Sequence, residues 1–128
     1  MQSSHVDRGR WGEEIAAAFL RLEGYRIVHR NFRYSRVEID ILARKGPVLA
    51  VVEVKYRRGA GWGGAVRAVS PRKQRDIETA AVGYLKVTGI AGLRVRFDVI
   101  TLDPAGEGRG LLVRHFPGAF SASGRYRL

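Results

Sequence analysis

Three consecutive segments have the residue pattern of β-strands. Residues 37–43 alternate between apolar and polar side chains, a period of two that is typical of a strand. Residues 48–56 form a run of strand-forming apolar residues, and residues 26–33 contain a shorter one. The connections are short and polar, and residues 44–47 have the composition of a tight turn. We therefore predict an antiparallel meander of three strands.

Two other segments carry apolar residues at helical spacing. Residues 12–23 repeat them at i, i+3, i+4 and i+7, which predicts an amphipathic helix. Its buried stripe would consist of Ile15, Ala18, Phe19 and Leu22. Residues 70–87 form the second predicted helix, with Ser70 as its N-cap, Pro71 as its first residue and a stop before Gly89.

Two further strands are predicted after the second helix, at residues 93–102 and 111–116. The second helix is long enough to act as a crossover between parallel strands. The order of elements therefore predicts an α/β fold, in which a mixed sheet with an αβββαβ core has helices on its faces.

The chain has 128 residues, enough for one domain with a single core, which we place at residues 9–120. Residues 1–8 are polar and residues 121–128 are polar and basic, and we expect both ends to be flexible. Residues 57–69 are rich in glycine and are expected to form a mobile loop.

Composition narrows the class of protein. Hydrophobic residues make up 45% of the chain, which is ordinary for a soluble globular protein. Apolar stretches fall short of the roughly 20 residues of a membrane span, and the first residues lack the apolar core of a signal peptide. We therefore expect a cytoplasmic protein with no membrane as partner. The absence of cysteine excludes disulfides, zinc–cysteine sites and thiol catalysis.

Positive charge is the strongest feature of the composition. Lysine and arginine number 23 against 12 acidic residues, a formal net charge of +11. Such an excess favours a polyanionic partner, most plausibly nucleic acid. An anionic membrane surface, a ribosome, or the arginine bias of a GC-rich genome would account for the same excess.

The candidate site residues lie in two triplets on neighbouring predicted strands. These are Glu-Ile-Asp at residues 38–40 and Glu-Val-Lys at residues 53–55. Charged groups in the apolar middle of a domain are costly unless something compensates them. A cation such as Mg²⁺ or Mn²⁺, held by Asp40, Glu53 and the Val54 carbonyl, would do so. Such a cation activates water and polarises a phosphate, which predicts phosphodiester hydrolysis.

Lys55 shares a strand face with Glu53 and would stabilise charge in the transition state. The two residues are also compatible with an exposed salt-bridged pair on a strand. Glu38 is expected to act as an accessory acid or as the partner of an arginine, and we favour the second interpretation.

One residue of each predicted helix supports this site. At about 100° per residue, Glu13 lies nearly opposite the apolar stripe of the first helix, whereas Glu14 borders it and is expected to reach the site. Lys73 is in register with the core face of the second helix and is expected to meet a phosphate. The alternatives are that Glu14 only complements the helix dipole and that Lys73 extends to solvent.

Several of these segments occur together, in this order, in a known group of proteins. They are Gly12-Glu13-Glu14, Arg30-Asn31-Phe32-Arg33, Glu38-Ile39-Asp40, Val52-Glu53-Val54-Lys55, Ser70-Pro71-Arg72-Lys73 and Arg96-Phe97-Asp98-Val99. The chain resembles the YraN family of small bacterial proteins over about residues 9–102. That family is similar to the PD-(D/E)XK nucleases, which include archaeal Holliday junction resolvases.

The resemblance implies a restriction-endonuclease-like fold with a magnesium-dependent site. Asp40 would take the place of the first acid, Glu53 and Lys55 that of the (D/E)XK motif, and Glu14 that of the acid on the N-terminal helix. Ile39 stands where the superfamily has proline, and Val37 where YraN proteins usually have glycine.

Taken together, these features predict a Mg²⁺- or Mn²⁺-dependent endonuclease that cuts DNA, including branched or structured DNA, with Asp40, Glu53, Lys55, Glu14 and Lys73 as site residues. A homodimer would suit symmetric cutting of a junction. The first alternative is a nucleic-acid-binding module that has this fold but little or no activity. The second is a basic structural protein on the ribosome or a membrane.

Overall fold

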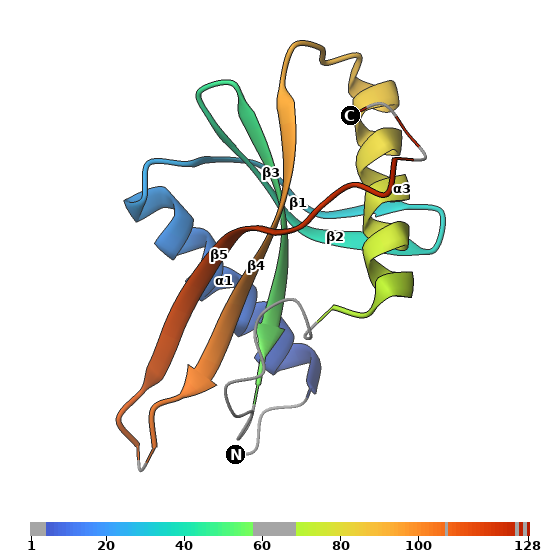
Figure 1. Cartoon of the computed structure of the whole chain (residues 1–128). Coiled ribbons are helices and arrows are strands. Elements are labelled where there is room, and N and C mark those ends of the chain that lie inside the picture. Colours follow the sequence, from blue (N-terminus) through green and yellow to red (C-terminus); the bar gives the residue numbers. More distant parts are fainter. Residues whose placement is uncertain (1–4, 58–68, 107, 125, 127) are drawn as a thin grey trace.

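The computed structural model describes residues 5–57, 69–106, 108–124, 126 and 128. These residues form two helices and a twisted sheet of five strands, which can be followed in Figure 1. The elements are α1 (His5–Leu22), β1 (Arg26–Tyr34), β2 (Val37–Lys45), β3 (Val48–Tyr56), α3 (Pro71–Thr88), β4 (Arg94–Pro104) and β5 (Leu111–Phe120). The predicted α/β class and element order are confirmed.

The strands lie in the sheet in sequence order, β1-β2-β3-β4-β5. The first three pair antiparallel, as the short turns predicted. β3 and β4 pair in parallel, which α3 permits by crossing from one to the other. β5 then pairs antiparallel with β4 and closes the mixed sheet.

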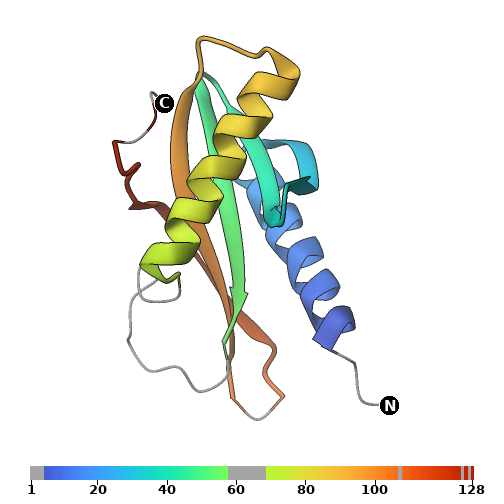
Figure 2. The ribbon, with the colours of Figure 1, turned by 90° about the vertical axis from the view of Figure 1, so that its right-hand side faces the viewer.

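The two helices cover opposite faces of the sheet (Figure 2). Each covers its own apolar cluster. The α3 side contains Ile39, Leu42, Leu49, Val51, Val69, Ile77, Ala80, Ala81, Tyr84, Phe97 and Val99. The α1 side contains Ala16, Ala17, Leu20, Tyr25, Ile41, Ala43, Ala50, Val52, Ile100 and Leu102. Because β3 contributes alternate residues to the two clusters, its two faces can be followed to the end of the strand.

The predicted buried stripe of α1 is wrong in part, although Ile15 packs against the α1-side cluster. Ala18 is exposed and Leu22 is 87% exposed, whereas Ala16, Ala17 and Leu20 are fully buried. Small residues decide the packing, because they let the helix axis approach the sheet closely. At Gly12 a Cβ atom would lie 2.9 Å from a methyl group of Leu102.

α3 begins and ends where the sequence predicted. The Ser70 hydroxyl accepts a hydrogen bond from the Lys73 backbone N–H at 3.1 Å, which satisfies one free N–H of the first turn. Gly89 ends the helix in a left-handed conformation, with φ of 69°. Close packing also fixes the middle of this helix, because a Cβ atom on Gly83 would overlap the Tyr34 ring.

Both ends of the described chain include ordered contacts or elements. α1 starts at His5, within the segment 1–8. At the other end, the Ser123 backbone N–H and hydroxyl donate to the buried Glu78 carboxylate at 3.0 and 2.9 Å. The tail 121–128 is therefore held against α3 at this point. Of the predicted glycine loop, residues 58–68 lie outside the described residues.

Neither described helix combines the length and the apolar character that a membrane span requires.

Candidate metal and active site

The pairing of β2 and β3 stops beside Asp40. The paired residues run from Lys45↔Val48 to Ile41↔Val52 and go no further. At the same place the alternation of β2 breaks, because Ile41 packs on the α1 side of the sheet and Ile39, two residues away, on the α3 side. This break in the alternation directs the Asp40 side chain differently from those of its neighbours. Asp40 therefore faces the gap between the two strands.

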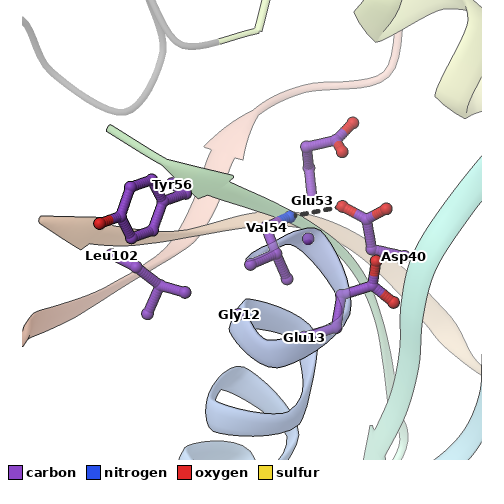
Figure 3. Close-up of a pocket in the computed structure, with 8 residues that line it drawn as sticks. Gly12, Glu13, Asp40, Glu53, Val54, Tyr56 and Leu102 are labelled. Atoms are coloured by element: carbon purple, nitrogen blue, oxygen red, sulfur yellow. Dashed lines mark hydrogen bonds between the residues drawn. The ribbon is translucent and has the colours of Figure 1, made fainter. Parts of the chain in front are cut away.

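The Asp40 carboxylate takes the place of the missing strand partner. Its Oδ2 atom accepts a hydrogen bond from the Val54 backbone N–H at 2.7 Å, which Figure 3 marks with a dashed line. The N–H and C=O of one extended residue point to the same side of a strand. The Val54 carbonyl therefore faces the gap as well, as its predicted role as a ligand requires.

Glu53 approaches Asp40 from the α3 side. Its side chain is only 8% exposed, and its Oε2 atom lies 4.0 Å from the Lys73 Nζ atom at the start of α3. Lys73 thus lies on the core side of its helix, as predicted. Lys55 follows on the same face of β3 and is half-buried. Glu53 and Lys73 are therefore brought together, as the sequence suggested.

The acid that α1 contributes is Glu13 and not Glu14, so this prediction is wrong. Glu14 is exposed and forms an ion pair with Arg30 at 2.7 Å. The Arg30 hydrogen bond lowers the pKa of Glu14. Glu13 points toward Asp40 (Figure 3). The reason is the rotated face of α1, because Glu13 lies beside Gly12 and Ala16 rather than beside the expected stripe.

A small open cavity of about 120 Å³ lies next to these acids. Its lining residues are Gly9, Gly12, Glu13, Asp40, Glu53, Val54, Tyr56 and Leu102. Glu14, Lys55 and Lys73 do not line this cavity. A space of this size accommodates a cation and a few water molecules rather than a whole nucleotide.

The acids alter one another's protonation. Burial, hydrogen bonding to Glu53 and the charge of Glu53 together raise the pKa of Asp40 to about 9, while the Val54 N–H and the Lys73 charge act in the opposite direction. Burial also raises the pKa of Glu13, and the hydrogen bond from Asn31 opposes that rise. At neutral pH the cation-free site therefore keeps a proton on the Asp40–Glu53 pair.

This donor set fits a hard divalent cation. Asp40, Glu53 and Glu13 supply carboxylate oxygens, and the Val54 carbonyl supplies a neutral oxygen, which are the ligand types that Mg²⁺ and Mn²⁺ prefer. A cation would replace the proton that the buried pair otherwise retains. The fit rests on this chemistry and on the partial burial of the acids.

Among the described residues, the acids whose oxygens all lie close to one another include Glu38 but not Glu53. Oxygens of Glu13, Glu38 and Asp40 lie within 4.8 Å of one another. Both Glu38 oxygens are already engaged, however, because Oε1 accepts from Asn31 at 3.1 Å and Oε2 from Arg33 at 3.3 Å. The interpretation of Glu38 as the partner of an arginine is confirmed. Asn31 had not been expected to touch the site.

Asp98 is fully buried and belongs to a separate network. Arg96 binds its carboxylate with two hydrogen bonds, at 2.8 and 2.7 Å, and His115 lies 2.8 Å away. Burial raises the pKa of Asp98, but the hydrogen bonds from Arg96 and His115 outweigh that effect and lower it overall. Arg96 also donates to the Tyr25 hydroxyl at 2.5 Å. Asp98 therefore orients a basic residue of the sheet.

Comparison with known proteins identifies the family. The sequence profile of the uncharacterised protein family UPF0102 matches residues 12–102. A UPF0102 protein of Syntrophotalea carbinolica is 44% identical over 124 residues, which cover 97% of this chain and 99% of the relative. Another, from Desulfosudis oleivorans, is 46% identical over 123 residues, 96% and 97% of the two chains.

The chain belongs to the UPF0102 (YraN) family. A Geobacter sulfurreducens member is 47% identical over 103 residues, which cover 79% of this chain and 80% of the relative. The segment that matches the UPF0102 profile runs from Gly12, at the start of the site, to Leu102, which lines the cavity. It therefore contains each of the acids described above, while β5 lies beyond it.

Proposed function

We propose that this UPF0102 protein is a metal-dependent hydrolase that cuts phosphodiester bonds in DNA, including branched or structured DNA. One observation carries the proposal: Asp40, Glu53 and Glu13, from β2, β3 and α1, converge where the β2–β3 pairing ends. Carboxylates that are at least partly buried and line one small cavity are costly without a cation or a proton between them. The positive charge of the chain adds a reason to expect a polyanionic substrate.

Asp40, Glu53 and the Val54 carbonyl would hold the cation, and Glu13 adds negative charge on the α1 side. When bound, a divalent cation supplies an activated water and polarises the phosphate oxygens. Mg²⁺ and Mn²⁺ are the candidates. Asp40 and Glu53 would hold the cation from rigid positions, because Asp40 is fixed by the Val54 N–H and Glu53 is buried beneath α3.

The basic groups beside the acids would bind the substrate phosphate. Lys55 and Lys73 lie on the Glu53 side, and the first turn of α3 carries no acidic residue. Backbone N–H groups of that turn and the two ammonium groups together favour an anion there. A lysine at this place would stabilise the charge that develops on the phosphate oxygens during the reaction.

A nucleic-acid-binding module without activity is the second candidate. One observation favours it: the Asp40 carboxyl, with its pKa raised to about 9 by burial and by Glu53, is satisfied in the cation-free fold by the shared proton and the Val54 N–H. The site therefore does not need a cation in order to fold.

Labelled linear, single-stranded and four-way-junction DNA separates the two candidates. Each substrate is incubated with the protein in Mg²⁺, in Mn²⁺ and in chelator, and the experiment is repeated with Asp40→Asn and Glu53→Gln. The proposal predicts cation-dependent cutting that both variants abolish. DNA binding without cutting in any cation would contradict hydrolysis and favour the binding module. A lack of DNA affinity even at low salt would contradict both.

A further inference from the structure

The Arg30–Arg33 segment of β1 is not used by the proposed chemistry, yet its side chains reach three acids around the site. Arg30 pairs with Glu14, and Asn31 contacts two more acids. Asn31 Nδ2 donates to Glu13 Oε1 at 2.6 Å and to Glu38 Oε1 at 3.1 Å. Each hydrogen of this amide thus has its own carboxylate acceptor.

The backbone of Asn31 is unusual in a way that serves this contact. Its φ of 53° lies in the left-handed region, which residues other than glycine rarely adopt inside a strand. The pairs Arg30↔Ile41 and Phe32↔Ile39 on either side place Asn31 opposite Asp40. The two strands are therefore irregular at the same step, and this turns the Asn31 amide toward the α1 side. Backbone strain of this kind concentrates at functional sites.

The two carboxylates that Asn31 contacts are held differently. Glu38 has both oxygens engaged, by Asn31 and by Arg33, so it is fixed as the anchor of the amide. Glu13 is held through one oxygen, and its second oxygen has no hydrogen bond among those described. A neutral amide orients both carboxylates without cancelling their charge, in contrast to Arg30, which neutralises Glu14 outside the site.

We infer that Asn31 is a positioning residue, which is anchored by Glu38 and holds the Glu13 carboxylate beside Asp40 for cation binding. This inference rests on the proposed function for its consequence, since the cation is what Glu13 is positioned to meet. Residues behind the ligands orient them, and their loss typically lowers metal affinity or activity about 10- to 100-fold.

Asn31→Gly is the informative variant, because glycine accepts the left-handed backbone and removes the side chain that carries the amide. Ser35→Gly is its matched control, since Ser35 also has a positive φ, 58°, but lies in the β1–β2 turn. We expect Asn31→Gly to raise the Mn²⁺ dissociation constant, measured by titration calorimetry, about 10- to 100-fold without loss of folding stability. Ser35→Gly should leave it unchanged. An unchanged constant in Asn31→Gly would overturn the inference.

Glu38→Gln tests the anchor. An amide oxygen still accepts from Asn31, so the Mn²⁺ dissociation constant should rise far less than in Asp40→Asn. An equally large rise would identify Glu38 as a ligand and overturn its role as the anchor.

A cation-free measurement separates this inference from the proposed function. In the ¹⁵N spectrum of the apo protein, Glu13→Gln should shift the side-chain amide resonances of Asn31, whereas Glu14→Gln should not. If the Asn31 amide resonances do not shift in Glu13→Gln, the positioning role is overturned whether or not a cation binds. If the wild-type protein binds no Mn²⁺ while these resonances shift as expected, the proposed function fails and the positioning of Glu13 stands.

Discussion

The Asp40 side chain accepts, at 2.7 Å, the backbone N–H of Val54 that would otherwise pair with β2. A carboxylate thereby replaces a strand at the point where two strands separate. The arrangement places charge in the middle of a sheet without leaving a backbone donor unpaired. It also fixes Asp40 between Glu53 on one side of the sheet and Glu13 on the other, which is the geometric basis of the proposed site.

Cation binding is expected to release a proton. Burial and Glu53 raise the pKa of Asp40 to about 9, so near pH 7 the cation must displace the proton of the pair. Calorimetric titration with Mn²⁺ in two buffers of different ionisation enthalpy should give a release of about one proton per ion. Affinity should increase with pH up to about 9. Binding without proton release would contradict the raised pKa.

The cation-free protein is expected to lose stability as pH rises. The pKa of Asp40 is 3.8 in its ordinary state and about 9 in the folded chain, so the folded state binds the proton more tightly between these values. The free energy of unfolding therefore falls through this range. Asp40→Asn keeps an acceptor for Val54 and has no proton to lose, so its pH slope should be shallower. Urea unfolding in chelator at pH 5, 7 and 9 measures this, and equal slopes would contradict it.

Glu13→Gln and Glu14→Gln form a matched pair on one helix. Only Glu13 lines the cavity, so Glu13→Gln should weaken Mn²⁺ binding and any DNA cutting at least about tenfold. Glu14→Gln removes an exposed ion pair with Arg30 and should change neither. Equal effects of the two variants on Mn²⁺ affinity would show that the face of α1 has been assigned incorrectly.

Lys73→Ala should slow DNA cutting at least about tenfold, because it removes a positive charge next to Glu53. It should also raise the pKa of Asp40 further, since the Lys73 charge lowers that pKa. Lys86→Ala is the control, at an exposed position in the last turn of the same helix. Cutting rates with Mg²⁺ for the two variants make the comparison. A similar loss in both would indicate only general charge attraction.

Much of the fold was accessible from the sequence because its signals are local. The strands and α3 follow from turn residues, apolar runs and the helix start at Ser70-Pro71. The parallel pairing of β3 with β4 follows from the length of the crossover between them. The buried face of α1 was not predicted correctly. The large apolar side chain of Leu22 was expected to be buried, whereas the small residues Gly12 and Ala16 pack closely against the sheet. The spacing of these two small residues, four positions apart, was the signal available in the sequence.

The same distinction between local signals and long-range packing applies to the site residues. Strand alternation and helical register placed Glu53 and Lys73, whereas Asp40 was chosen as an acid on the neighbouring strand. Asn31 was missed, because the neighbouring residues do not predict a left-handed backbone at this position of a strand. The break in alternation at Asp40 likewise depends on how β1, β2 and β3 pair, and it cannot be read from any one segment.

The position of Mn²⁺ in crystals of the protein, found from its anomalous scattering, tests the central claim most directly. The proposed site predicts one strong peak in the gap between β2 and β3, coordinated by Asp40 and Glu53 and absent in Asp40→Asn. A peak held only by Glu13 and Glu38, or no peak beside Asp40 at saturating Mn²⁺, would contradict it.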